Sequence, residues 1–175
     1  MPSWNTHLEI GSRLADKLNI VGKKRREFLL WSILPDINNG YVNHPHIVKA
    51  HEETHYNYGG DGPANFYAEN KSKIDKKEPL CLAYFVHLIA DDIFNKDFYH
   101  RIKTTQYKDK PEEELVDLKH NDFWLYGTNF RHILDFSKEE AETLAKKANQ
   151  IRSVDINSDD ILEVVKIIEL DEIND

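Results

Sequence analysis

The sequence has little cysteine, no long apolar run and fewer basic than acidic residues, and each scarcity excludes a class of protein. Cys81 is the only cysteine among the 175 residues, so neither an intramolecular disulfide nor a cysteine-rich structural zinc site can form. The longest apolar stretch, around residues 80–90, is too short to span a membrane. The N-terminus lacks the charged start and apolar core of a secretory signal. We therefore expect a cytoplasmic protein without a membrane span.

The charge balance limits the class of partner. Lys and Arg number 23 and Asp and Glu number 31, which gives a formal net charge of −8 at pH 7. Nucleic-acid polymers are bound mainly through Lys and Arg contacts to phosphates, so we expect no such partner. A small phosphorylated substrate stays compatible with the acidic chain, because bound cations can reverse the local field. The nine histidines are a high number for a chain of this length.

Strand-like alternation of apolar residues is also scarce, whereas helical spacing is frequent, so we predict an all-α protein with a single domain over residues 1–175. Helices are expected over residues 6–18, 23–34, 45–56, 64–74, 79 to about 103, 112–134 with a break at 127, from 138 onward, and 158–170. Thr6 is the expected N-cap of the first helix, and Pro35 should end the second. Ser137 and Glu140 have the spacing of a capping box.

The stretch from residue 82 to 92 is the most informative one, because an apolar helix there carries His87 and Asp91. Residues four apart lie on one helix face, with Cβ atoms roughly 5–6 Å apart, so both side chains can reach one cation. The helix is apolar on nearly every side and should be central and buried. A buried carboxylate is costly unless it is paired or bound to a metal. The pair therefore indicates a metal site or an internal His–Asp hydrogen bond.

Further possible ligands are spread along the chain: His7, Asp36, His51, His55, Asp92, His120 and Asp122. His51 and His55 form a second pair four residues apart, a spacing that suits one metal ion. Asp36 follows the proline at the expected helix end, where turn chemistry is the alternative explanation. The last two candidates are only two residues apart, so at most one of them should face a given site.

Four short blocks follow one another in an order shared by one enzyme family. They are Pro2-Ser3-Trp4-Asn5-Thr6-His7, Ser32-Ile33-Leu34-Pro35-Asp36-Ile37, Thr54-His55-Tyr56 and Tyr84-Phe85-Val86-His87-Leu88-Ile89-Ala90-Asp91. Together they resemble the zinc-dependent phospholipase C family, and more closely its small bacterial cytoplasmic branch. The blocks cover roughly the first two thirds of the chain. The resemblance implies a helical bundle of the phospholipase C/P1 nuclease type.

The resemblance also implies a metal cluster that hydrolyses phosphodiester or phosphomonoester bonds in a small phosphoester or phospholipid-like substrate. By position, the implied ligands are His7, Asp36, His55 (or His51 in its place), His87 and Asp91. Asp36 would also act as general base, and Asp91 could bridge two metals. The implied cofactor is one to three zinc ions, with iron or manganese as alternatives.

Two features depart from the family pattern. Secreted members bind zinc through an N-terminal tryptophan, whereas Trp4 is internal here. They also carry a second His-x-x-x-Glu pair, which this chain lacks after His87; His120 or Asp122 are possible substitutes. A reduced site of one or two metals is therefore as compatible with the sequence as a site of three.

The expected chemistry is phosphoester hydrolysis by a metal-activated water. A bound metal lowers the pKa of water from about 15.7 to about 7, and Asp36 would orient or deprotonate that water. One alternative is a phosphohydrolase of the HD type, but the chain has no adjacent His-Asp pair. The other alternative is a non-catalytic or degenerate helical metal-binding protein, which the missing second pair favours.

Overall fold

A computed structural model describes residues 3–127 and 129–169; the side chains of residues 97, 98, 119, 120, 122–124, 126 and 127 lie outside this description. The elements, in chain order, are α1 (Trp4–Lys17), α2 (Lys23–Trp31), α3 (Leu34–Ile37), α4 (His51–Thr54), the 3-10 turn η1 (Tyr58–Gly60), α5 (Gly62–Asp75), α6 (Pro79–Ile93), the π-helix η2 (Phe94–Tyr99), α7 (His100–Thr105), α8 (Glu112–Gly127), α9 (Lys138–Ala148) and α10 (Ser158–Glu169). Every regular element in the described ranges is a helix, so the all-α prediction is confirmed. None of the described helices is long and apolar enough to cross a membrane.

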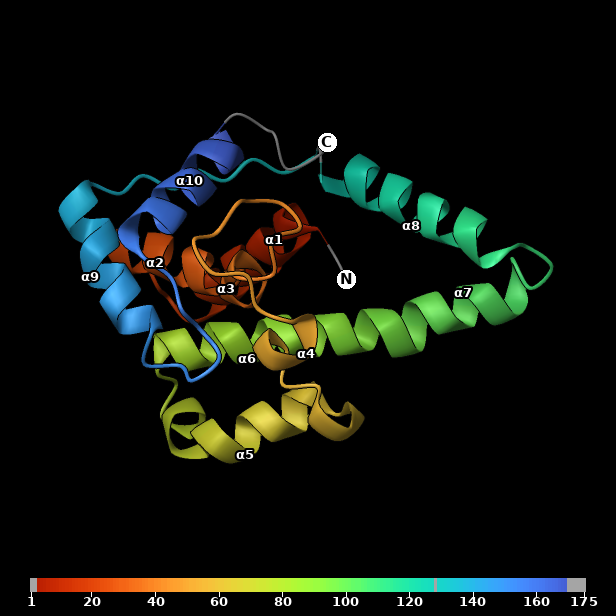
Figure 1. The fold of residues 1–175 in the computed structure, drawn as a ribbon, viewed down its shortest axis with the longest axis horizontal. Helices are drawn as coiled ribbons and strands as arrows, with labels where there is room; N and C mark the ends of the chain where they lie inside the picture. The colour runs from red at the N-terminus through yellow and green to blue at the C-terminus, as the bar shows by residue number, and fades with distance from the viewer. Residues whose placement is uncertain (1–2, 128, 170–175) are drawn as a thin grey trace.

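The central element is α6, as its apolar sequence predicts. It crosses the middle of the molecule and runs on through η2 into α7 (Figure 1). Pro79 lies in its first turn, where a missing N–H leaves no hydrogen bond unmade, and the Glu78 side chain caps the helix at the N–H of Cys81. Helices α1, α2, α3 and α5 all contact α6. Side chains on α6 are therefore surrounded by several other elements.

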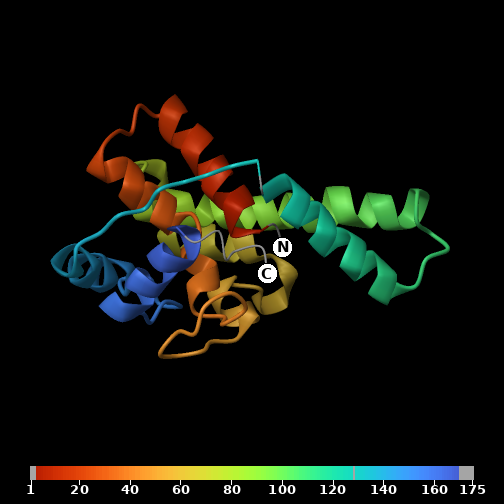
Figure 2. The ribbon, with the colours of Figure 1, turned by 90° about the horizontal axis from the view of Figure 1, so that it is seen from above.

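The continuation of α6 forms a projection on one side of the molecule. From above, η2 and α7 extend away from the other helices, and α8 returns from the far end of the projection (Figure 2). On its return α8 contacts α1. Asp91 lies two residues before the end of α6, at the base of this projection.

Aromatic side chains fill the core where α5 meets α6. The rings of Phe66 and Tyr84 stack with centroids 4.6 Å apart, and Tyr56 packs edge-on against Phe66 at 5.0 Å. The hydroxyl of Tyr84 donates a hydrogen bond to the backbone carbonyl of Thr54 and lies 3.0 Å from the Ser153 hydroxyl. Because Tyr84 is on the central helix, this contact fixes the end of α4 against α6.

Helix α9 begins at the predicted capping box. The Ser137 hydroxyl accepts from the N–H of Glu140 at 3.2 Å, and the Glu140 carboxylate accepts from the N–H of Ser137 at 3.0 Å. Two ion pairs join α9 to α2: Lys23 with Glu140 at 2.8 Å, and Lys147 with Glu27 at 3.2 Å. Together α9 and α10 cover the side of the molecule next to α2 (Figure 1).

The first two predicted helices have different ends in the structure. Ser3, not Thr6, is the N-cap of α1, because its extended backbone lets its hydroxyl accept from the N–H of Thr6. Pro35 does not end α2, which stops at Trp31. It lies instead in the first turn of α3, a position that proline tolerates well. Asp36 is consequently part of a short helix and not of a loop that follows a helix.

Two further helices are shorter than predicted. The expected helix over 45–56 is only one turn, α4, because Ala50 is extended and the N–H of Lys49 bonds to the carbonyl of Asn38. The expected helix over 112–134 ends at Gly127 as α8. By contrast, α5 extends only slightly past the predicted range and is capped by Asp61.

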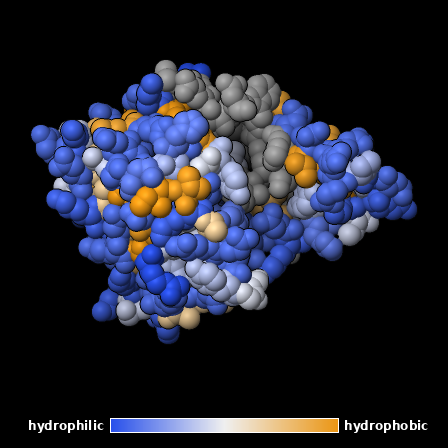
Figure 3. Space-filling view, viewed as in Figure 1, coloured by the Kyte–Doolittle hydropathy of each residue, from blue (hydrophilic) through white to orange (hydrophobic). Residues whose placement is uncertain are grey.

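Most of the surface is hydrophilic, in keeping with the charged composition (Figure 3). An apolar patch lies over the loop between α3 and α4, where Ile47 and Val48 are exposed (Figure 3).

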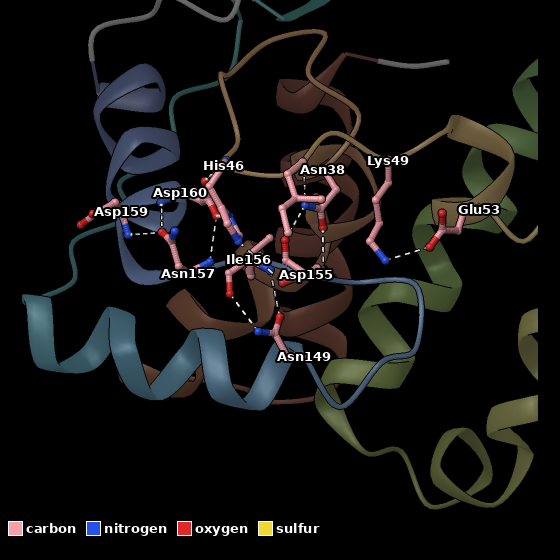
Figure 4. A network of polar contacts seen from close by, with 11 residues as sticks. Asn38, His46, Lys49, Glu53, Asn149, Asp155, Ile156, Asn157, Asp159 and Asp160 are labelled. Carbon is pink, nitrogen blue, oxygen red and sulfur yellow. Dashed lines mark hydrogen bonds and ion pairs between the residues drawn. The ribbon is translucent and has the colours of Figure 1, made fainter.

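A polar clasp, formed by Asn38, His46 and Asp160, ties this loop to the start of α10 (Figure 4). The buried carboxylate of Asp160 accepts from the backbone N–H groups of His46 and Asn157, both at 2.8 Å, and lies 2.6 Å from His46 Nδ1. The Asn38 amide donates to the carbonyls of Ile47 and Asp155, and its oxygen accepts from the Asp155 N–H. The clasp therefore fixes the loop that joins α3 to α4.

Replacement of Asn38 tests the clasp. Asn38→Ala should lower the free energy of unfolding by about 2–3 kcal/mol, because the fully buried Asn38 amide makes three hydrogen bonds to backbone groups that would lose their partner. Asn149→Ala is the matched control, since Asn149 makes a similar pair of backbone hydrogen bonds to Ile156 from an exposed position; it should cost about 1 kcal/mol. Urea unfolding of both variants checks the prediction, and equal losses would contradict it.

Candidate metal centre

The five side chains implied as principal ligands meet in one buried cluster, the His/Asp cluster: His7, Asp36, His55, His87 and Asp91. They come from α1, α3, the C-cap of α4, and α6. Each is between 1% and 6% exposed. Segments far apart in the sequence thus place three imidazoles and two carboxylates within reach of one another.

Asp91 lies at the middle of the cluster. Its Oδ1 is 3.2 Å from His7 Nε2, and its Oδ2 is 3.2 Å from His55 Nε2 and 3.6 Å from His87 Nε2. Despite these short distances, neither carboxylate oxygen of Asp91 has a partner in hydrogen-bond geometry among the described residues. Both ring nitrogens of His7 likewise lack a partner in hydrogen-bond geometry among the described residues. Buried polar atoms are rarely left so, and each exception asks for an explanation such as a bound ion.

The second carboxylate, Asp36, faces the same imidazoles from α3. Its Oδ1 is 3.4 Å from His55 Nε2, and its Oδ2 is 3.8 Å from His87 Nε2. The side-chain amide of Asn39 donates to Oδ1 at 3.0 Å. This hydrogen bond from a neighbour in the same turn fixes the orientation of the carboxylate.

Hydrogen bonds to the backbone fix the tautomer of His87. Its Nδ1 is 2.8 Å from the carbonyl oxygen of Ser32, which can only accept, so Nδ1 carries the proton. In the neutral ring, Nε2 then presents its lone pair to the cluster, where His55 Nε2 is 3.3 Å away. Metal-binding histidines are typically oriented in this way, with the outer nitrogen bonded to a carbonyl or carboxylate. At His55 the outer nitrogen lies 2.9 Å from the Thr54 hydroxyl.

The imidazole rings stack in two pairs. His7 and His87 have centroids 3.7 Å apart, and His51 and His55 have centroids 3.8 Å apart. His51 is half-buried and has a ring nitrogen within 4.8 Å of ligand atoms of His55 and Asp91. The sequence offered His51 as a substitute for His55, whereas the structure brings both to the cluster. They stack because α4 is one turn long and they stand at its two ends.

The two buried carboxylates dominate the electrostatics. Burial alone would raise the pKa of Asp36, but His87 and His55 beside it hold that pKa below its ordinary value. The pKa of Asp91 is lowered by the same histidines against its burial. Burial would lower the pKa of His55, yet the two carboxylates beside it, Asp36 and Asp91, raise it to about 9. In the cluster, a proton on His55 supplies the positive charge that the carboxylates need.

The two outer histidines carry no such charge. Burial, together with the nearby His87, lowers the pKa of His7. Burial and the nearby His55 lower the pKa of His51. Both rings are therefore neutral at pH 7, and a neutral imidazole is the form that binds a metal.

Of the remaining candidate ligands, Asp92 is the one whose side chain is described, and it does not join the cluster. Asp92, one residue beyond Asp91, forms an ion pair with Lys96 at 2.7 Å. The side chains of His120 and Asp122 lie outside the described residues. Sequence reasoning also missed three supporting groups: the carbonyl of Ser32, the hydroxyl of Thr54 and the amide of Asn39. Nothing in the spacing indicates Ser32, whereas Thr54 directly precedes His55 and Asn39 follows Asp36 by three residues.

The donor set fits a divalent metal such as zinc. Imidazole nitrogen and carboxylate oxygen are both common zinc ligands. An internal His–Asp hydrogen bond, the alternative for His87 and Asp91, does not account for the carboxylate, because its oxygens are not in hydrogen-bond geometry. Comparison with known protein families, curated proteins and solved structures finds no match for the chain.

Metal retention tests the cluster. Protein purified without chelator should contain zinc or another divalent metal, and His87→Ala and Asp91→Asn should each lose it, because each removes a ligand from the middle of the cluster. His100→Ala is the control, since His100 is exposed on α7. Elemental analysis measures the metal, and circular dichroism verifies that the variants remain helical. Full metal content in folded His87→Ala and Asp91→Asn proteins would rule out the assignment.

The raised pKa of His55 predicts a pH dependence for the metal-free protein. This pKa is about 9 in the folded state and about 6.5 in the unfolded chain. Protonated His55 therefore stabilises the fold fully below pH 6.5, and the contribution is lost as the pH rises towards 9. With chelator present, the free energy of unfolding should fall by on the order of 3 kcal/mol across this window. His55→Gln should remove the slope and His100→Gln should keep it; a flat profile for the unmodified chain would contradict the prediction.

Proposed function

We propose that the chain is a metal-dependent phosphoric ester hydrolase, with an all-α fold of the phospholipase C/P1 nuclease type. The observation that carries the proposal is the buried Asp91 carboxylate, which lies between three imidazoles without a hydrogen bond that satisfies it. Such an arrangement suits a cation better than it suits an empty polar cluster. The resemblance of the four sequence blocks to zinc-dependent phospholipase C supplies the reaction class.

The ligands proposed for the metal are the five members of the His/Asp cluster. His87 is oriented by the Ser32 carbonyl so that its lone pair faces inward. Each imidazole has one inward nitrogen and can hold one ion, whereas the two oxygens of Asp91 face different histidines and could serve two. Bound zinc would supply Lewis acidity and lower the pKa of a water molecule towards neutrality.

Asp36 is the proposed general base. Its carboxylate is held by Asn39 and has a lowered pKa, so it is ionised and able to accept a proton at neutral pH. Because it also lies near His55 and His87, it could orient a water molecule next to the metal ligands.

A small cavity gives a substrate access to the cluster. It has a volume of about 120 Å³, and His51, His55 and Asp91 are among its lining residues. Pockets that enclose drug-sized ligands typically measure about 300–1,000 Å³, so this one suits a compact polar group such as a phosphate. The size favours a small phosphoester over a bulky substrate held entirely inside the protein.

The second candidate function is a non-catalytic metal-binding protein. One observation favours it. Within the described residues, every group of side chains that could hold a metal overlaps the His/Asp cluster, so these groups form one candidate site. A site with fewer metals than secreted phospholipase C could bind zinc for stability alone.

Activity measurements separate the two candidates. Zinc-loaded protein should hydrolyse p-nitrophenyl phosphate or bis(p-nitrophenyl) phosphate, and Asp36→Asn should lower kcat by about 10²–10⁴-fold, because the base is lost. Asp75→Asn, an exposed aspartate on α5, is the control that should leave kcat unchanged. Bound zinc without turnover of nucleotides, phospholipid analogues or either nitrophenyl ester would support the binding protein instead.

A further inference from the structure

The cavity next to the His/Asp cluster contains one cationic side chain at its mouth. Among the described residues that line the cavity, Lys96 is the only lysine or arginine. Its side chain is 57% exposed, so the ammonium group lies at the solvent side, whereas His55 and Asp91 line the buried side. Asn57 and Asn95 add neutral polar groups to the same lining. Metal ligands and a cation therefore face one small space.

Local helix geometry brings Lys96 to this space. Lys96 follows Asp91 by five residues and belongs to the π-helix η2, which begins directly after α6. Asp91 itself lies in α6, before η2 begins, whereas Asp92, four residues before Lys96, lies on the same side of the helix as Lys96 and pairs with it. π-Helical turns are rare in proteins, and those that occur are often found at functional sites.

One ion pair of Lys96, the pair with Asp92, can be exchanged for a ligand. Lys96 Nζ is 2.7 Å from Asp92 Oδ1, one turn back along the helix, and Asp92 also lines the cavity. Exposed ion pairs of this kind contribute little to stability, typically below about 1 kcal/mol. An arriving anion can therefore take the place of Asp92 at low cost.

We infer that Lys96 binds a phosphate oxygen of the substrate and makes the site selective for the dianionic phosphate of a phosphomonoester over the singly charged phosphate of a diester. This inference rests on the proposed function, since it names the substrate class of the same site. A dianionic phosphate carries two negative charges, so its oxygens can interact with the metal on the buried side of the cavity and with Lys96 at its mouth. The volume of about 120 Å³ fits a terminal phosphate, whereas a diester has to leave the cavity in two directions.

The test uses inorganic phosphate as the first probe and the zinc-loaded chain of 175 residues. Isothermal titration should show phosphate binding to the unmodified protein, and Lys96→Met should raise the Kd about tenfold, while Lys96→Arg should restore most of the affinity. Lys71→Met is the matched control: Lys71 also pairs with an aspartate one turn away, at 2.8 Å and with 61% exposure, but it lies on α5 and does not line the cavity. Zinc content should be equal in all four proteins.

Kinetics provide the second readout. Lys96→Met should lower kcat/KM for p-nitrophenyl phosphate about tenfold, mainly through KM, and change the value for bis(p-nitrophenyl) phosphate by less than about twofold. Equal phosphate affinity in Lys96→Met and unmodified protein, an equal loss in Lys71→Met, or an equal loss on both esters would each overturn the inference. If zinc or all hydrolysis is absent from the unmodified protein, the proposed function itself fails, and that result is distinct from a failure at Lys96.

Discussion

Two buried carboxylates need a positive charge, and the arrangement around them follows from that need. Asp36 and Asp91 are both less than 10% exposed and lie near the same imidazoles. An isolated ionised carboxylate cannot remain in such surroundings, so it must be protonated, paired with a cation or bound to a metal. The two carboxylates raise the pKa of His55, so they favour positive charge at this point. A divalent ion would meet the same need and also release the proton from His55.

The fold supplies rigid supports for the side chains that meet this need. His87 and Asp91 are one turn apart on the central helix, and the Ser32 carbonyl at the end of α2 fixes the His87 ring. Tyr84, one turn before His87, holds Thr54 beside His55. The polar clasp, which includes the hydrogen bonds of Asn38 to the backbone of Asp155, fixes the loop that separates Asp36 from His51. The side chains of the His/Asp cluster thus depend on hydrogen bonds made by residues outside the cluster.

The sequence predicts the part of the cluster that follows from helix periodicity. His87 and Asp91 share a face because the residues around them are apolar and helical, and the structure bears out this helix. The approach of His7 and Asp36 depends on packing between distant segments, so only the resemblance to a family indicated it. The predicted helix boundaries were wrong where contacts between distant residues set them. The carbonyl of Asn38 accepts a hydrogen bond from the N–H of Lys49 and keeps Lys49 out of a helix, although residues 45–56 have helical spacing. The π-helix that carries Lys96 leaves no periodic signal, and Lys96 was therefore missed.

The position of the cluster links the proposed site to the stability of the whole chain. His7 and Asp91 come from segments more than eighty residues apart, yet their side chains are 3.2 Å apart in the interior. A metal bound here would join α1, α3, α4 and α6 through side chains alone, in a protein whose single cysteine excludes a disulfide for that purpose. Because the unfolded chain holds no preformed site, the free energy of metal binding would add to the free energy of folding. Conservation of such ligands in a relative would therefore not by itself demonstrate catalysis, since a structural metal imposes the same geometry. The residues that distinguish the two roles are those that face the cavity without holding the metal, and Lys96 is the clearest of them.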